Sequence, residues 1–226
     1  MQLQSKYRSK LYRDFRAIEP GEWRKIARYY EAHEEAIKGL DFEEHFEMIT
    51  AYTKALFEIG AYEKHIRMAD AVIEESVMNN VKFFHGEDIF HQMLFKKAAS
   101  CYHTWQLDNA DYILRELLRI DPWDKDAALF LKKCLRKSRP LLLHRCRAAM
   151  MLCFLLGALI VCVEFIVVRN FYPSYTSLFE VSRNVVFLSG IGMVALGEML
   201  HWWRTGREVE RFAAMLRRRK ATRKEF

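Results

Sequence analysis

One short stretch of the chain concentrates side chains that could bind a metal ion. Residues 84–91 read FHGEDIFH and place His85, Glu87, Asp88 and His91 within seven positions. Imidazole and carboxylate groups are zinc ligands, but three or four of them must converge on the ion. They would do so only if this stretch folded back on itself. In a simpler interpretation, Gly86 forms a turn and Asp88 caps the N-terminus of the next helix. We therefore expect neither a metal nor a cofactor.

The chain contains no motif that predicts a catalytic centre. None of the histidines lies in an HExxH motif, no serine or cysteine lies in a nucleophile motif, and no glycine-rich phosphate loop is present. The acidic run FEEHFE at 42–47 is explained better by a solvated helix face than by paired catalytic carboxylates. We therefore expect a protein that is not an enzyme. A membrane-bound enzyme whose site is assembled from distant residues stays open as a weaker alternative.

The elements that position these residues are predicted to be helices. Apolar residues recur three or four positions apart between residues 11 and 137, and no stretch alternates as a strand would. Gly39, Gly60 and Asp121 are expected to end helices. Asp41 is expected to start one, with Glu44 as its capping-box partner. The predicted fold class is all-α, with no sheet.

Two pairs of these expected helices resemble tetratricopeptide repeats. The better copy covers residues 94–122 and an earlier, more divergent copy covers residues 49–79. The better copy matches the family pattern at Leu94, Ala98, Leu107, Ala110, Leu114 and Pro122. Its Leu107 corresponds to Tyr62, 45 residues earlier, whereas the family repeats about every 34 residues. The resemblance implies a helical-hairpin repeat domain over residues 1–137, with about 11 inserted residues near 81–91 and a capping helix at 124–137.

The same resemblance implies that the domain binds a protein or peptide. Arrays of this family typically hold peptides in a concave groove lined by the first helix of each repeat. Lys54, Lys96 and Lys97 lie on the expected first helices and are the candidate partner-binding residues. The asparagines that complete the carboxylate clamp of one subclass are missing here. Lysines that only contact solvent are the alternative.

Two apolar stretches later in the chain are each long enough to cross a membrane. About 20 helical residues span a hydrocarbon core about 30 Å thick. We expect transmembrane helices at 148–168 and 184–203, joined by a short non-cytoplasmic loop at 169–183. A basic juxtamembrane linker at 138–147 precedes them, and a basic amphipathic tail at 204–226 follows. Two buried helices of a soluble core are the alternative.

The charge distribution predicts how this hairpin is oriented. Residues 1–130 hold 18 basic and 23 acidic side chains, whereas residues 131–226 hold 18 and 6. Basic residues flank the apolar stretches and are sparse between them, which places both termini in the cytoplasm. The membrane would be the plasma or inner membrane if the source is bacterial. Nucleic acid is not expected as a partner. The basic residues expected to contact anionic lipid headgroups are Arg145, Arg147, Arg204, Arg207, Arg217, Arg218, Arg219 and Lys220.

Charged and small residues inside the apolar stretches suggest specific contacts. Glu164 and Glu198 are membrane-embedded acidic residues, and either interfacial ion pairs or a polar site between helices would explain them. Arg169 or Arg183 could pair with the first, and Arg204 or Arg147 with the second. The residues expected in close helix packing, within the hairpin or between copies, are Ala158, Cys162, Gly190 and Gly197.

Beside the weaker enzyme alternative, the sequence leaves two functions open. The first is a membrane-anchored adaptor, whose cytosolic repeat domain recruits a protein or peptide. The second is an effector whose hairpins form a homo-oligomer that permeabilises the membrane, with the helical domain as its regulator. The number of copies that assemble would separate them.

Overall fold

The computed structural model describes residues 9–84, 86–138, 141–168 and 176–224. Nearly all of these residues are helical, so the predicted all-α fold class is confirmed. Contacts divide the chain into two units, residues 1–131 and 132–226. The helix that contains the boundary contributes residues to both units.

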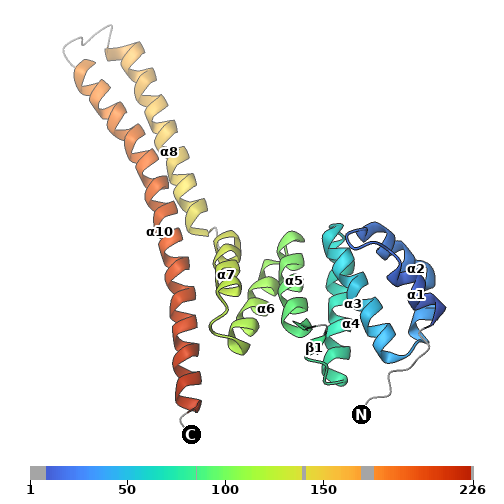
Figure 1. Cartoon of the computed structure of the whole chain (residues 1–226). Coiled ribbons are helices and arrows are strands. Elements are labelled where there is room, and N and C mark those ends of the chain that lie inside the picture. Colours follow the sequence, from blue (N-terminus) through green and yellow to red (C-terminus); the bar gives the residue numbers. More distant parts are fainter. Residues whose placement is uncertain (1–8, 85, 139–140, 169–175, 225–226) are drawn as a thin grey trace. The chain divides into compact units, whose positions relative to one another are not determined.

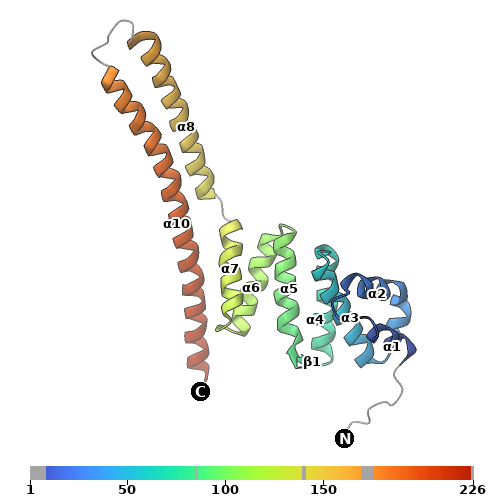
Figure 2. The same cartoon turned by 45° about the horizontal axis from the view of Figure 1, so that its top comes forward.

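The first unit is a series of helices that follow the chain order (Figure 1). They are α1 (Lys10–Arg16), α2 (Trp23–Lys38), α3 (Phe42–Glu58), α4 (Tyr62–Met78), α5 (Ile89–His103), α6 (Leu107–Ile120) and the start of α7 (Lys125–Ser138). From α2 to α6, each helix packs against the next one, which both views show (Figures 1 and 2). The predicted stops at Gly39, Gly60 and Asp121 are confirmed, since α2, α3 and α6 end just before them.

The prediction of no sheet is wrong at one place. Strand β1 (Phe83–Phe84) pairs with β2 (Glu87–Asp88) in antiparallel register, with Phe84 opposite Glu87. Gly86, between the strands, has a φ of 84°, in the left-handed region that glycine adopts without strain. Two residues per strand are too few to show an alternating pattern, so these strands could not be predicted from the sequence.

The helix pairs α3–α4 and α5–α6 repeat the same geometry 45 residues apart. Ala61 donates its N–H to the carbonyl of Leu56 at 2.9 Å, and Gln106 donates to Cys101 at 2.8 Å. The residue before each donor is left-handed, with φ of 81° and 62°. Equivalent positions are buried in both pairs: Thr53 and Ala98, His65 and Ala110, Ala69 and Leu114, and Val72 and Leu117. The 45-residue offset inferred from the sequence therefore holds in three dimensions.

The second unit contains an apolar helical hairpin. It is formed by α8 (Leu141–Val163), a π-helical turn η1 (Glu164–Val168) and α10 (Thr176–Lys224). Helices α8 and α10 lie side by side in both views. Both are long and apolar enough to cross a membrane, over Cys146–Ile166 and within Glu180–Thr222.

The boundaries of these helices differ from the expected segments. Helix α8 already begins at Leu141, inside the segment expected as a linker, and α10 continues without a break from the hairpin into the basic tail. In the expected loop, residues 169–175 lie outside the described residues, while 176–183 form the first turns of α10. Helical propensity thus extends each helix beyond its apolar stretch.

Candidate partner-binding site

Polar side chains of α3 bond two other parts of the first unit, the segment that contains α1 and strand β2. The Ser9 backbone N–H and hydroxyl donate to the Glu44 carboxylate at 2.9 and 2.7 Å. The hydroxyl of Tyr12 donates to Glu47 at 2.6 Å, and Arg16 bonds the same carboxylate at 2.9 Å. The expected capping box is therefore not formed: Asp41 makes no side-chain cap, and Glu44 bonds the residue that precedes α1 instead.

Each of the three candidate lysines is paired within the chain. Lys54 Nζ lies 2.6 Å from a Glu87 oxygen, and this hydrogen bond lowers the pKa of Glu87. Lys96 lies 3.1 Å from Glu58 and 4.9 Å from the centre of the Phe57 ring. Lys97 bonds Asp70 of α4. These lysines therefore hold neighbouring elements together, rather than extending freely into solvent.

A small cavity lies between α3 and the β1–β2 strand pair, beside the Lys54–Glu87 ion pair. Its volume is about 150 Å³, enough for one small side chain. Thr50 is 5% exposed, and its hydroxyl has no hydrogen-bond partner. The cavity is lined by Glu47, Thr50, Ala51, Lys54, Phe84, Glu87 and Ile89. It can accept a small side chain that carries a hydrogen-bonding group for Thr50, because a buried polar atom gains by acquiring a partner.

Sequence reasoning found Lys54 but missed Thr50 and the β1–β2 pair. Phe84 of β1 packs edge-on against Phe46 of α3, with ring centroids 5.3 Å apart. This contact places the inserted segment over the face of α3. Thr50 could have been noticed, since it lies one helical turn before Lys54 on an expected first helix. However, nothing in the sequence indicated that the inserted segment would cover this face of α3.

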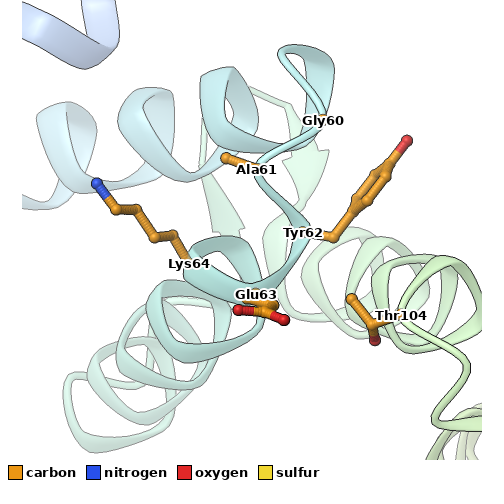
Figure 3. A pocket seen from close by; sticks show the side chains of 6 residues that line it. All are labelled: Gly60, Ala61, Tyr62, Glu63, Lys64 and Thr104. Carbon is orange, nitrogen blue, oxygen red and sulfur yellow. The ribbon is translucent and has the colours of Figure 1, made fainter.

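A second hollow, at the α3–α4 turn, brings no polar groups together (Figure 3). Its volume is about 420 Å³, and the Tyr62 and Lys64 side chains point in different directions around it. Lys64 bonds Glu31 at 3.0 Å. The Thr104 hydroxyl donates back to the carbonyl of Ser100 in its own helix at 3.0 Å. We therefore assign no site to this hollow.

The cluster considered for a metal is engaged in other contacts. His85 lies outside the described residues, and Glu87 bonds Lys54. Asp88 caps α5 by accepting the N–H of His91 at 2.9 Å, as the sequence predicted. The His91 ring lies 2.8 Å from Asp124. Within the described part of the chain, no three potential metal ligands converge.

A histidine and a serine form a buried pair that the sequence did not reveal. His65 Nδ1 lies 2.8 Å from the Ser100 hydroxyl, between α4 and α5. Burial, with a smaller contribution from the charge of Lys96, lowers the pKa of His65 to about 4. Both side chains are completely buried, so a substrate cannot reach them. The pair therefore stabilises the packing of α4 on α5 and does not form a nucleophilic centre.

The two acidic residues within the apolar stretches of the hairpin, Glu164 and Glu198, have arginine partners. Glu164 lies 3.4 Å from Arg183, and Glu198 lies 4.0 Å from Arg147. Each arginine was among the partners expected from the sequence. The Glu198–Arg147 contact is long, and both of its side chains are more than half exposed.

The hairpin packs along a seam of small residues. A Cβ added at Gly197 would lie 2.6 Å from Cys146 Sγ, and one added at Gly190 would lie 3.0 Å from Cys153 Cβ. Gly157 approaches the ring of Phe187 in the same way. Ala158 and Cys162 are instead exposed on the outer side of α8. Sequence reasoning missed Cys146, Cys153 and Gly157, whose 7- and 4-residue spacing was the available signal.

The expected headgroup-binding residues are spread along α8 and α10. Arg147 and Arg204 are exposed, and Arg207 lies over the Trp203 ring, 3.5 Å from its centroid. In the tail, Arg217, Arg218 and Arg219 are exposed, and Lys220 is half-buried. The side chain of Arg145 lies outside the described residues.

Comparison of the chain with protein-family models, with curated proteins and with solved structures finds no match. The geometry of these sites therefore carries the assignment of function.

Proposed function

We propose that the chain is a membrane-anchored interaction scaffold. In this proposal, the α8–α10 hairpin crosses the membrane, and the first unit is a tetratricopeptide-like domain that binds a protein or peptide in the cytoplasm. The observation that carries the anchoring is the exposure of the hairpin's apolar side chains. The observation that supports partner binding is the α3 cavity with its unpartnered threonine.

Many apolar side chains of the hairpin are exposed, which would be unfavourable in water. Only 6% of the Cys146–Ile166 segment is buried. Leu152, Leu155 and Leu159 of α8 are each more than 60% exposed, and so are Leu188 and Leu196 of α10. Burying one leucine is worth about 2 kcal/mol. Lipid would supply this burial, whereas the core helices of a soluble protein would already have it.

The geometry of the first unit supports the tetratricopeptide interpretation. Two helix pairs repeat with the same turns, and small or medium side chains fill equivalent buried positions 45 residues apart. Proteins of this family typically bind peptides on first helices. The α3 cavity lies on the first helix of the earlier pair. We therefore assign it as the place where a side chain of the partner inserts.

Site-specific photocrosslinking in cells tests the binding face. A photoreactive amino acid at Glu58, exposed on α3, should crosslink a protein partner, whereas the same group at Glu74, exposed on α4, should not. Adding Ala51→Phe should fill the cavity and abolish the Glu58 crosslink, while Ala51→Ser should preserve it. Equal crosslinking from both positions would contradict the assignment of this face.

A second candidate is the oligomeric membrane effector. The outward exposure of Ala158 and Cys162 favours it, since small residues on the outside of a hairpin permit close contact between copies. Oxidative crosslinking through Cys162 in native membranes would distinguish the two. A ladder of covalent oligomers would support the effector, and monomer alone would support the scaffold.

A further inference from the structure

We propose that the junction of α7 and α10, within the second unit, binds the phosphate of an anionic phospholipid headgroup through Arg136 and Trp202. This inference rests on the proposed membrane anchoring, which it makes specific. It concerns residues 132–138 of α7 and 201–210 of α10 only.

Arg136 is a cation with a buried side-chain donor, Nε, that has no hydrogen-bond partner among the described residues. Its guanidinium carbon lies 4.1 Å from the centroid of the Trp202 ring. Among the residues that the structure describes, no carboxylate pairs with Arg136. A guanidinium held over an aromatic ring offers its remaining donors in a fixed fork, which suits phosphate oxygens.

The backbone of α7 is fixed at the same point. His201 Nε2 lies 3.1 Å from the carbonyl oxygen of Arg136, in the last turn of α7. One helical turn earlier, Lys132 passes α10 at Gly206, where an added Cβ would lie 3.0 Å from Lys132 Nζ. Within the described ranges, the ion pair of Lys132 is a long contact of 3.9 Å with Glu210. A second cation therefore lies on the same face of α7 as Arg136.

The position of the site identifies the anion as a lipid headgroup. Trp202 is 63% exposed and lies at the end of the apolar stretch of α10. Its neighbour Trp203 is also exposed and has Arg207 over its ring. Tryptophans at the end of a membrane span lie at headgroup depth. An anion at that depth is the phosphate of a phospholipid, and a net negative lipid satisfies both Arg136 and Lys132.

Lipid binding to the full-length protein in a mild non-ionic detergent tests the proposal. Native mass spectrometry would follow titration with phosphatidylglycerol and with phosphatidylcholine. The wild type should bind phosphatidylglycerol about tenfold more tightly. Arg136→Gln should remove most of this preference, Arg136→Lys should retain part of it, and Trp202→Leu should weaken it. Arg67→Gln, on the exposed surface of α4, is the matched control and should change nothing.

Several outcomes would overturn the headgroup site. One is an unchanged preference in Arg136→Gln, and another is an equal loss in Arg67→Gln. Displacement of phosphatidylglycerol by millimolar inorganic phosphate would show a site for the free anion instead. Failure of the anchoring itself is distinguishable, because wild-type and variant proteins would then be released from membranes by alkaline carbonate. If only the headgroup site is wrong, both proteins stay in the membrane.

Discussion

Buried polar side chains determine how the first unit responds to pH. His65 is fully buried, and its pKa is lowered to about 4, whereas an unfolded histidine titrates near 6.5. As pH falls below 6.5, the unfolded chain takes up a proton that the folded chain does not bind. The free energy of unfolding therefore decreases with falling pH, and the stability is complete only above about pH 7.

The first prediction concerns this histidine. Between pH 7.5 and pH 5, the free energy of unfolding should fall by about 2 kcal/mol on account of His65. His65→Ala, which places in α4 the residue found at the equivalent position 110, should lose this dependence. Urea unfolding of the full-length protein in mild detergent, followed by circular dichroism, measures both. His103→Ala, at an exposed position, is the control and should keep the slope; a slope that survives in His65→Ala would refute the assignment.

Individual residues were predictable from the sequence where the contact is local. Asp88 as the cap of α5 is such a case, since its partner is three residues away. The partners of Lys54, Lys96 and Lys97 lie 33, 38 and 27 residues away, so spacing along one helix could not reveal them. The burial of Thr50 and His65 could not be predicted for the same reason, because it depends on segments distant in sequence that pack onto them.

At the scale of elements, glycine stabilises the turns in which a residue adopts the left-handed backbone conformation. Gly60 has a φ of 81° in the α3–α4 turn, and a Cβ there would meet nothing within 4 Å. Any cost of a side chain at this position is therefore one of backbone conformation, not of steric contact. Gly39 ends α2 with a φ of −87°, which every residue tolerates.

The second prediction compares these two glycines. Gly60→Ala should lower the free energy of unfolding by about 1 kcal/mol, because alanine is strained in the left-handed region. Gly39→Ala should leave it unchanged or raise it slightly, since alanine restricts the unfolded chain. The same urea titration measures both variants. Equal losses would mean that the turn does not require its left-handed residue.

The third prediction concerns the seam of the hairpin. Gly197→Cys should form a disulfide with the native Cys146, because an added Cβ would lie 3.1 Å from the Cys146 Cβ. This is a few tenths of an ångström closer than the Cβ atoms of a disulfide, so a small outward shift of the two helices brings the cysteines into range. Gly192→Cys should form no disulfide with α8, since Gly192 has no atom within 4 Å of its Cβ position. Mass spectrometry of peptides from the oxidised, full-length protein identifies the bond. A disulfide from position 192, or none from 197, would contradict the register of α8 and α10.

Helices were predictable here because their apolar residues recur at helical spacing, and because α2, α3 and α6 end near a glycine or proline. The repeat offset followed from matching Tyr62 with Leu107, which begin α4 and α6. The β1–β2 pair was missed because four residues carry no periodic signal. Ala158 and Cys162 were expected in close packing from their spacing alone, but the seam runs through Cys153 and Gly157, since a helix of small residues has several faces that could pack.

At the scale of the whole molecule, the charge asymmetry and the apolar hairpin make one joint prediction. If the hairpin spans the membrane, residues before α8 and after its apolar stretch in α10 lie on the same side. The excess of basic residues at these ends predicts that this side is the cytoplasm. The scaffold proposal depends on this arrangement, because a partner-binding unit outside the cell would meet different proteins.

The fourth prediction, and the most direct test of this arrangement, is cysteine accessibility in intact cells. Single cysteines would be placed at Asn79 in the first unit, at Ser177 near the hairpin's turn and at Thr222 in the tail, in a chain whose five native cysteines are replaced. A membrane-impermeant thiol reagent added outside should label only Ser177→Cys, and all three should be labelled after permeabilisation. Outside labelling of Asn79→Cys, or labelling of Ser177→Cys and Thr222→Cys from the same side, would contradict the membrane hairpin and the cytoplasmic scaffold together.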